Sequence, residues 1–379
     1  MSYLGKEIGK LGFGLMRLPM QGADVDIEQS KIMVDKFMEA GFTYFDTAYG
    51  YIEGKSEEAV KEILVKRYPR EAFQLATKLP AWAGAKTAEE AKQMLQTSLD
   101  RTGAGYFDYY LLHNLGGDRI DVFDKFGLWD YVQEQKAKGV IKHVGFSLHD
   151  SAEVLDDILT KHPEVEFVQL QINYADWESA SVQSRACYEV ALKHDKPIII
   201  MEPVKGGLLA VPPKAVADIL TEANPKVSAA SWSLRYAASL DNIITVLSGM
   251  SDIAQMEDNL VTMKDFKVLD EAEVATIKRA QVAIDTIQGI DCTGCDYCTK
   301  DCPANLAIPA IFGAMNKYLI YDNLQSAKGE YNGWIKGALK SDAANCIACG
   351  LCEEVCPQKL HIYRRIKACR RDAELIKVW

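Results

Sequence analysis

Eight short apolar runs, separated by segments with helical periodicity, constrain the fold of most of this chain. They lie near residues 12–16, 43–46, 73–77, 107–112, 141–147, 167–172, 197–202 and 243–247. Alternating strand and helix patterns favour a parallel sheet, and eight such units favour a closed barrel over an open doubly wound sheet. The span from residue 1 to about 283 also fits the usual barrel size of about 250 residues. We therefore predict an α/β chain that begins with a (β/α)8 TIM barrel.

The segments around these runs predict a floor for the barrel and several helices. Residues 4–11, punctuated by Gly5 and Gly9, predict a hairpin that closes the floor. Residues 27–40 predict a helix with Gly41 as its stop signal. The eighth barrel helix is expected near residues 252–264, and a charged amphipathic helix is expected over residues 270–286.

Chemically useful side chains stand where three of the predicted strands end. The second run stops at Asp46, which Tyr49 and Tyr51 follow closely, the third gives way to Lys78, and the fourth gives way to His113. The carboxyl ends of all strands of such a barrel converge on one face. Residues that are scattered in the sequence can therefore form one constellation there.

The set Asp46, Tyr51, Lys78 and His113 suits the protonation of a carbonyl oxygen while hydride reaches its carbon. An isolated tyrosine has a pKa of about 10, which is too high for a good acid at neutral pH. A neighbouring lysine ammonium is expected to lower that pKa, and a carboxylate would hold the lysine charged and oriented. The histidine would orient or polarise the carbonyl. Any one of these residues alone is more often a packing residue, so only the four together indicate this chemistry.

On these residues the chain resembles the aldo/keto reductase family. The family motif Asp-Thr-Ala-x-x-Tyr stands here at residues 46–51, and the resemblance covers roughly residues 8 to 283. In that family the tyrosine five residues after the aspartate is the acid, which selects Tyr51 over Tyr49. The resemblance implies an oxidoreductase with NAD(H) or NADP(H) as cofactor and a small carbonyl or alcohol as substrate. It makes Asp46, Tyr51, Lys78 and His113 the catalytic residues.

Later strand ends carry small and amide side chains that a ligand lying across the barrel could contact. The resemblance implies that Ser147 and Gln171 hold the nicotinamide amide, and that residues 249–259 cradle the adenosine end with Asn259 on the adenine. The predicted cofactor contacts are Ser147, Gln171, Asn173, Gly249, Met250, Gln255 and Asn259. For each of them a loop or helix cap is the alternative.

The segment after the last strand departs from the pattern of many NADPH-using members of the family. Those members carry arginine or lysine there, whereas this chain has Gly249, Met250, Ser251, Asp252 and then Gln255. The choice between NADH and NADPH, or the use of neither, therefore stays open, with a weak preference for NADH.

Eight of the ten cysteines form the one clear internal repeat, near the end of the chain. Residues 292–303 and 346–357 each read C-x2-C-x2-C-x3-C-P. This spacing resembles the bacterial-type ferredoxin motif, and two copies imply two [4Fe–4S] clusters. Thiolates two residues apart let a tight loop wrap one face of a cubane, with backbone N–H groups directed at the sulfides.

In two-cluster ferredoxins the fourth cysteine of each copy ligates the other cluster. The resemblance therefore assigns one cluster to Cys292, Cys295, Cys298 and Cys356, and the other to Cys346, Cys349, Cys352 and Cys302. A zinc ribbon would need paired C-x2-C knuckles without the extra cysteines, and disulfides are disfavoured in a cytoplasmic chain. The two remaining cysteines, Cys187 and Cys369, are expected to be free thiols.

Composition indicates a soluble chain of two domains, which we expect in the cytoplasm. The chain has no run of about 18 apolar residues, and its N-terminus lacks the form of a secretory signal. The predicted domains are the barrel at residues 1–283 and a small, mainly α-helical, ferredoxin-like iron–sulfur domain at residues 284–379. The helical pattern from Ile308 onward favours this type over a compact βαβ ferredoxin.

The charge pattern limits the partners. A net charge of −10 argues against nucleic acid or an anionic membrane as the main partner. The basic run at residues 364–371 is either a solvated face or a docking site for an acidic, ferredoxin-like redox partner.

Two classes of function fit these features. The leading hypothesis is an enzyme that transfers hydride at a carbonyl or alcohol, with Tyr51 as acid/base, coupled to electron transfer through two 4Fe–4S clusters. The alternative is an electron-transfer protein whose barrel is a docking or sensing scaffold without carbonyl reductase activity, which the missing cations after the last strand favour. A third hypothesis gives the clusters a purely structural role.

Overall fold

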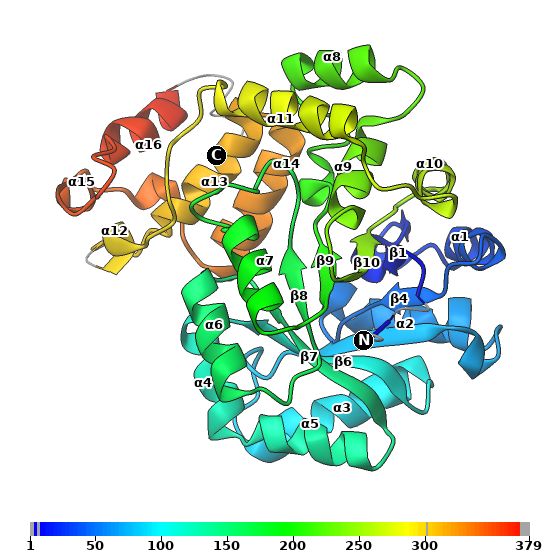
Figure 1. The fold of residues 1–379 in the computed structure, drawn as a ribbon. Coiled ribbons are helices and arrows are strands. Elements are labelled where there is room, and N and C mark those ends of the chain that lie inside the picture. Colours follow the sequence, from blue (N-terminus) through cyan, green and yellow to red (C-terminus); the bar gives the residue numbers. More distant parts are fainter. Residues whose placement is uncertain (1–3, 6–7, 301, 372–379) are drawn as a thin grey trace. The chain divides into compact units, whose positions relative to one another are not determined.

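The computed structural model describes residues 4–5, 8–300 and 302–371, and the side chains of residues 118 and 368–371 lie outside this description. The chain divides into two compact units (Figure 1). The first contains residues up to 178, 182–206 and 226–274, and the second contains residues 179–181, 207–225 and 275 onward. The predicted domain boundary between residues 283 and 284 stays a prediction.

A closed barrel of eight parallel strands forms the centre of the first unit, as predicted. The strands in barrel order are β1 (Leu11–Gly14), β10 (Ile243–Ser248), β9 (Ile198–Met201), β8 (Phe167–Gln171), β7 (Ile141–Leu148), β6 (Phe107–Leu115), β5 (Gln74–Leu79) and β4 (Tyr44–Asp46). Gly14 of β1 pairs with Asp46 of β4, and Phe13 pairs with Ser248 of β10. Because every strand is parallel to its neighbours, their carboxyl ends form a single rim.

Helices of the first unit surround these strands (Figure 1). They are α1 (Ile27–Glu39), α2 (Lys55–Val60), α3 (Ala88–Thr102), α4 (Ile120–Lys125), α5 (Leu128–Ala137), α6 (Ala152–Lys161), α7 (Ser184–Lys193), α9 (Ala229–Ala238) and α10 (Ile253–Lys264). The predicted first and eighth barrel helices are confirmed. Asp26 and Asp252 cap the N-termini of α1 and α10, because each carboxylate accepts a hydrogen bond from a backbone N–H in the first turn.

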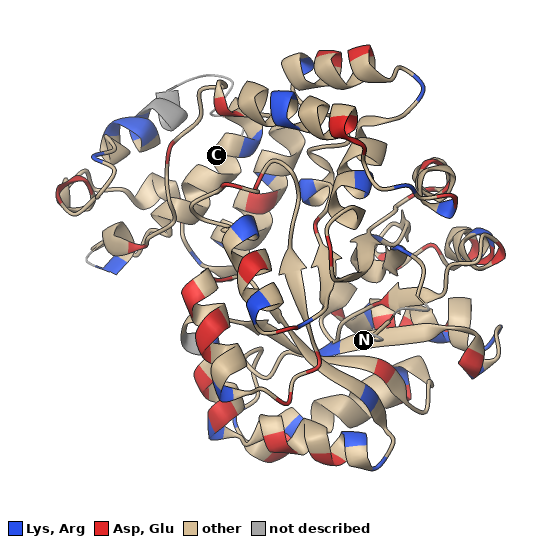
Figure 2. Cartoon of the chain, viewed as in Figure 1, with Lys and Arg blue, Asp and Glu red and all other residues tan. Residues whose placement is uncertain are grey.

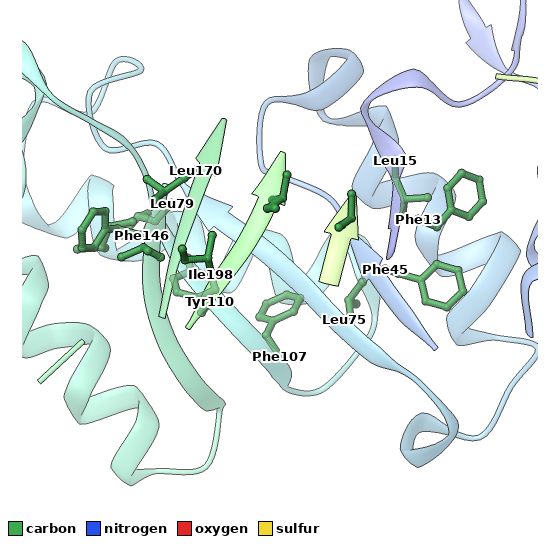
Figure 3. Close-up of a cluster of buried hydrophobic side chains, with 14 of the residues drawn as sticks. Phe13, Leu15, Phe45, Leu75, Leu79, Phe107, Tyr110, Phe146, Leu170 and Ile198 are labelled. Carbon is green, nitrogen blue, oxygen red and sulfur yellow. The ribbon is translucent and has the colours of Figure 1, made fainter. Parts of the chain in front are cut away.

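Apolar side chains fill both the shell between strands and helices and the inside of the barrel. In the shell, the buried rings of Phe13 and Phe45 pack on Phe37 of α1, with ring centroids 5.6 and 5.2 Å apart, and Figure 3 shows the strand side of this core. Inside the barrel, Tyr109 of β6 packs on Tyr44 of β4 and on Phe167 of β8, each two strands away. Packing of this kind makes the barrel rigid, so that the side chains at its rim are held in fixed positions.

Two details differ from the sequence prediction. The floor hairpin is wrong for the described residues, since Leu4, Gly5, Ile8 and Lys10 lie in turns and bends; residues 6 and 7 lie outside the described residues. Ile8 instead belongs to the cluster of buried side chains inside the barrel, together with Tyr44 and Ile244. Strands β5 and β6 also continue past the positions at which they were expected to end, so that Lys78 and His113 belong to the strands.

The second unit is mainly helical, as predicted, and its described residues contain no strand. Its helices are α8 (Lys214–Ala223), most of α11 (Glu271–Asp285), α12 (Tyr297–Lys300), α13 (Ile308–Leu319), α14 (Leu324–Gly329) with a π-helix over Glu330–Ala338, α15 (Leu351–Glu354) and α16 (Ile362–Arg371). Ile311 and Phe312 of α13 form a core with Tyr331 and Ile335 of the π-helix. No helix in the described part of the chain is long and apolar enough to cross a membrane.

Candidate functional site

Asp46, Lys78 and Tyr51 form one hydrogen-bonded group at the carboxyl end of the barrel. The Lys78 side chain is only 1% exposed, and its Nζ donates to Asp46 Oδ1 at 2.5 Å and to Tyr51 Oη at 3.1 Å. A third bond goes to the carbonyl oxygen of Thr47 at 2.8 Å. An ammonium has three protons to donate, so this network uses all of them. Because the phenol oxygen of Tyr51 accepts from Lys78, its own proton is free to be donated to a ligand.

Gln169 supports this group from β8, and the sequence analysis missed it. Its Nε2 donates to Asp46 Oδ2 at 3.0 Å, and the residue is 1% exposed. The Asp46 carboxylate is therefore fixed through both oxygens, which in turn orients Lys78. The available signal was an amide in the otherwise apolar run Phe167–Leu170, a position where a buried polar group needs a partner.

The backbone next to Tyr51 is strained. Ile52 and Glu53 have φ angles of 51° and 57°, in the left-handed region that β-branched residues avoid. The surrounding chain holds this turn in place: the hydroxyl of Ser56 donates to the carbonyl oxygen of Leu15 at 2.9 Å. Strain of this kind is found mostly at functional sites, where the surroundings fix a side chain in one position.

His113, on β6, stands beside Tyr51 with 6.1 Å between the ring centroids. Its Nδ1 is buried and has no hydrogen-bond partner among the described residues, and none binds Nε2. A buried donor without a partner is rarer than a buried acceptor without one, which favours the tautomer with the proton on Nε2. Burial, reinforced by the charge of Lys78, holds the pKa of His113 well below its usual value. The ring is therefore neutral at pH 7 and can donate one hydrogen bond to a ligand.

The sequence analysis predicts that Lys78 lowers the pKa of Tyr51, but in the structure the pKa of Tyr51 is raised. Burial raises the pKa of Tyr51 above its ordinary value of 10.0, and the attraction of Lys78 offsets this only in part because Asp46 opposes it. Burial also works against the charge of Lys78, but Asp46 and Tyr51 outweigh it and raise the pKa of Lys78. The site thus combines a neutral phenol with a charged ammonium, and Lys78 limits the rise instead of producing a net fall.

The predicted nicotinamide contacts lie on β7 and β8 and in the loop after β8. Ser147 is buried, and its Oγ accepts from the backbone N–H of Asn114 at 2.8 Å. Gln171 donates to Asp176 Oδ2 at 3.1 Å. The Asn173 amide is fully buried and bonds to both Asp176 and the carbonyl oxygen of Glu202, so it acts within the protein and supports the neighbouring loop.

The predicted adenosine contacts surround the start of α10. Gly249 is exposed, whereas the Met250 side chain is 1% exposed and belongs to the apolar core. Gln255 folds back on the capping residue Asp252, with Nε2 and Oδ2 3.0 Å apart. Asn259 donates to Ser248 Oγ at 2.6 Å and is 5% exposed. Gly249 and Gln255 are therefore open to a ligand, while Met250 offers only its backbone.

Each predicted cysteine quartet of the second unit lines one cavity. One cavity is lined by Cys292, Cys295, Cys298 and Cys356, and the other by Cys302, Cys346, Cys349 and Cys352. Both quartets combine three cysteines of one motif copy with the fourth of the other copy, which is the predicted crossing. Ile308 lines both cavities, and an apolar lining of this kind shields a bound cluster from water.

The two cysteine loops share an unusual backbone conformation. Gly294 and Asp296 of the first copy have φ angles of 71° and 60°, and the matching Ala348 and Gly350 of the second copy have 61° and 83°. Such alternation directs successive backbone N–H groups into one concavity, as in many iron–sulfur sites. An alanine or aspartate adopts this conformation at a cost of about 1–3 kcal/mol, which a loop shaped around a ligand explains.

The cavities fit a multi-atom cluster better than a single ion. Among the described residues, no three histidine, cysteine, aspartate or glutamate side chains come close enough together to hold one metal ion. A tetrahedral zinc site needs four ligands that converge to about 2.3 Å from one point. Of the two remaining cysteines, Cys187 is a buried free thiol in α7, and the side chain of Cys369 lies outside the described residues.

The eight-stranded parallel barrel, with Asp46, Lys78, Tyr51 and His113 at its rim, is typical of a class of oxidoreductases. Residues 10–282 match the model of the aldo/keto reductase family, and residues 291–360 match that of a 4Fe–4S dicluster domain. The chain therefore belongs to the aldo/keto reductase family, as its motifs predict, and it carries a 4Fe–4S dicluster domain after the barrel. As a member of this family it is an oxidoreductase.

Known proteins similar to this chain match about 70% of its length. An uncharacterized oxidoreductase of Bacillus subtilis, YqkF, is 24% identical in an alignment of 294 positions that covers 70% of this chain and 90% of that protein. An aldo-keto reductase of Mycobacterium sp. (strain MCS) is 27% identical in an alignment of 279 positions that covers 72% of this chain and 87% of that protein.

Solved structures show the same fold. The holo form of aldo-keto reductase AKR11C1 from Bacillus halodurans has a TM-score of 0.59 at 24% identity and covers 74% of this chain and 95% of its own. An aldo-keto reductase of Klebsiella pneumoniae in complex with NADPH has a TM-score of 0.55 at 21% identity and covers 72% of this chain and 90% of its own.

Proposed function

We propose that this protein transfers hydride between a nicotinamide dinucleotide and a small carbonyl or alcohol, coupled to electron transfer through two [4Fe–4S] clusters. The observation that carries the proposal is the group formed by buried Asp46 and Lys78 and half-buried Tyr51, in which the ammonium is fully bonded and the phenol proton is free. The relative that binds NADPH supports a nicotinamide dinucleotide as the cofactor.

In carbonyl reduction, His113 and Tyr51 act on the same oxygen atom. The Nε2–H of His113 donates to the carbonyl oxygen and polarises the C=O bond. Tyr51 gives its phenolic proton to this oxygen as hydride reaches the carbon, so the π bond breaks while one C–H and one O–H bond form. Lys78 stabilises the phenolate, which regains a proton from solvent. Alcohol oxidation is the reverse.

The chain's own residues suit both cofactors. Ser147 and Gln171 are proposed to hold the nicotinamide amide, and each crossed cysteine quartet is proposed to hold one cluster. When bound, a reduced dinucleotide would carry one electron pair, which could go either to a carbonyl as hydride or to the two clusters as one electron each, so that alcohol oxidation would supply the electrons for the clusters. In the second quartet, the backbone N–H of Leu306 also donates to Cys302 Sγ at 3.5 Å. Hydrogen bonds to ligating sulfurs raise reduction potentials.

An acidic, ferredoxin-like electron carrier is the proposed redox partner. Tyr363 and Ile366 of α16 line the cavity of the second quartet, and Arg364 and Arg365 of the same helix are exposed. Figure 2 shows basic residues in blue on the described part of α16. A positive surface close to a redox site favours the approach of a negatively charged partner.

The pH dependence of carbonyl reduction tests the function and the acid together. Anaerobically purified protein, NADH or NADPH, and a panel of aldehydes and ketones should give alcohol. Because the pKa of Tyr51 is raised and that of His113 is lowered, kcat/KM should stay level between about pH 6 and 9. It should fall only above the ordinary tyrosine value of about 10, where the phenol loses its proton.

Two outcomes of this assay would contradict the proposal. Failure to reduce any carbonyl with either dinucleotide would favour the barrel as a scaffold. A fall in kcat/KM centred near pH 7 would mean that a group other than Tyr51 supplies the proton.

A further inference from the structure

The sequence after the last barrel strand offers no cation, yet the structure brings one there from the other end of the chain. Arg17 follows β1, in a short 3-10 helix over Leu15–Arg17. Its carbonyl oxygen accepts a hydrogen bond from Ser251 Oγ at 2.9 Å, which ties this turn to the entry of α10. Arg17 is therefore far from α10 in sequence and adjacent to it in space.

The Arg17 side chain lies across two glycines at the rim of the barrel. A Cβ atom built on Gly249 would stand 3.3 Å from Arg17 Cδ, and one built on Gly206 would stand 3.3 Å from Arg17 Nη2. Gly206 follows β9, the seventh barrel strand, and Gly249 follows β10, the eighth. The loops after these two strands frequently form the phosphate site of TIM-barrel enzymes.

The guanidinium of Arg17 is free to bind an anion. Arg17 is exposed, and its guanidinium has no hydrogen-bond, ion-pair or ring partner in the part of the chain that the structure describes. Lys205, the residue before Gly206, is by contrast paired with the buried carboxylate of Asp176. An arginine presents several N–H donors in a planar fork, which matches phosphate oxygens.

We propose that Arg17 binds a phosphate group of the nicotinamide dinucleotide. The inference rests on the proposed function, which puts the adenosine end of the dinucleotide along residues 249–259. Because Gly206 and Gly249 carry no side chains, the Arg17 side chain can lie across them, and it supplies the charge that this segment lacks. A dinucleotide has phosphate groups in two places. NADH and NADPH share the diphosphate, and only NADPH has the 2′-phosphate.

Direct binding of NADH and NADPH to the anaerobic full-length protein tests this inference without turnover. Arg17→Met keeps the aliphatic stem that packs on Gly249 and removes only the charge. We expect it to weaken binding about tenfold to a hundredfold, the usual effect of losing a charge-assisted hydrogen bond. Equal loss for both dinucleotides would identify the diphosphate, and loss for NADPH alone would identify the 2′-phosphate.

Two further variants separate this role from packing. Lys264→Met removes an exposed, unpaired cation at the far end of α10 and should leave both dissociation constants within about twofold. Arg17→Lys keeps the charge and should restore part of the affinity. Thermal unfolding of each variant would show whether the fold is retained.

The outcomes distinguish this inference from the proposed function. Wild-type binding that Arg17→Met leaves unchanged for both dinucleotides would overturn the role of Arg17 alone. A wild-type protein that binds neither dinucleotide would overturn the role of Arg17 and the proposed function together.

Discussion

Replacing Tyr51 with phenylalanine is expected to lower kcat for carbonyl reduction by about 10²- to 10⁴-fold, the usual contribution of a general acid. The change removes the proton donor but keeps the ring that packs beside His113. Lys78 would lose one hydrogen-bond acceptor while keeping Asp46 and the carbonyl oxygen of Thr47. The fold and the affinity for the dinucleotide should therefore change little. Single-turnover kinetics and direct dinucleotide binding measure the two effects separately.

Tyr49→Phe is the matched control for this prediction. Tyr49 lies two residues away, and its ring packs under the Arg101 guanidinium, whose carbon is 4.4 Å from the ring centroid. Loss of the Tyr49 hydroxyl should leave kcat within about twofold, because it contacts no member of the catalytic group. Normal turnover in Tyr51→Phe, or a large loss in Tyr49→Phe, would mean that the acid has been misassigned.

Replacing Cys356 with alanine is expected to remove one cluster of two. The wild-type chain should carry about eight iron and eight sulfide, and Cys356→Ala should retain about four of each. Cys356 lines the cavity of Cys292, Cys295 and Cys298, although it belongs to the second motif copy in the sequence. Metal analysis of anaerobic protein gives the iron content, and Cys187→Ala, which removes a buried thiol of the barrel unit, should retain about eight.

Double variants test the crossing of the fourth ligands. Cys295 and Cys349 are the exposed members of the two quartets. Cys356→Ala combined with Cys295→Ala should still retain about four iron, because both changes fall on one cluster. Cys356→Ala combined with Cys349→Ala should leave almost none. The reverse pattern would show that each motif copy supplies all four ligands of its own cluster.

Repetition in the sequence explains what could be predicted without the structure. The eight βα units predict the barrel because each strand needs the next to bury its apolar face, and closure puts Asp46, Lys78 and His113 at one rim. The spacing of the cysteine motifs predicts a tight loop around a cubane, and the resemblance to two-cluster ferredoxins predicts which fourth cysteine joins each quartet. Strands β5 and β6 end later than predicted, because Lys78 donates to Asp46 of β4 and the backbone N–H of Asn114 donates to Ser147 of β7.

What the sequence could not predict depends on tertiary contacts. Gln169 and Arg17 lie more than a hundred residues from Asp46 and Gly249, their partners at the rim, so no local pattern joins them. The pKa of Tyr51 is raised because the effect of burial outweighs the attraction of the nearby Lys78 ammonium. Burial of this residue is visible only in the folded barrel. Local chemistry therefore identifies the reacting groups, while their surroundings decide how strongly each one acts.

Electron exchange between the dinucleotide and the clusters tests the central claim most directly. Anaerobic protein would be mixed with NADH or NADPH when oxidised, and with NAD⁺ or NADP⁺ after chemical reduction, so that both directions of the equilibrium are covered. Cluster absorbance and nicotinamide absorbance should change together with at least one dinucleotide, with about two cluster electrons for each nicotinamide. Clusters that do not respond to any of the four dinucleotides would contradict coupling and leave the barrel and the dicluster domain functionally separate.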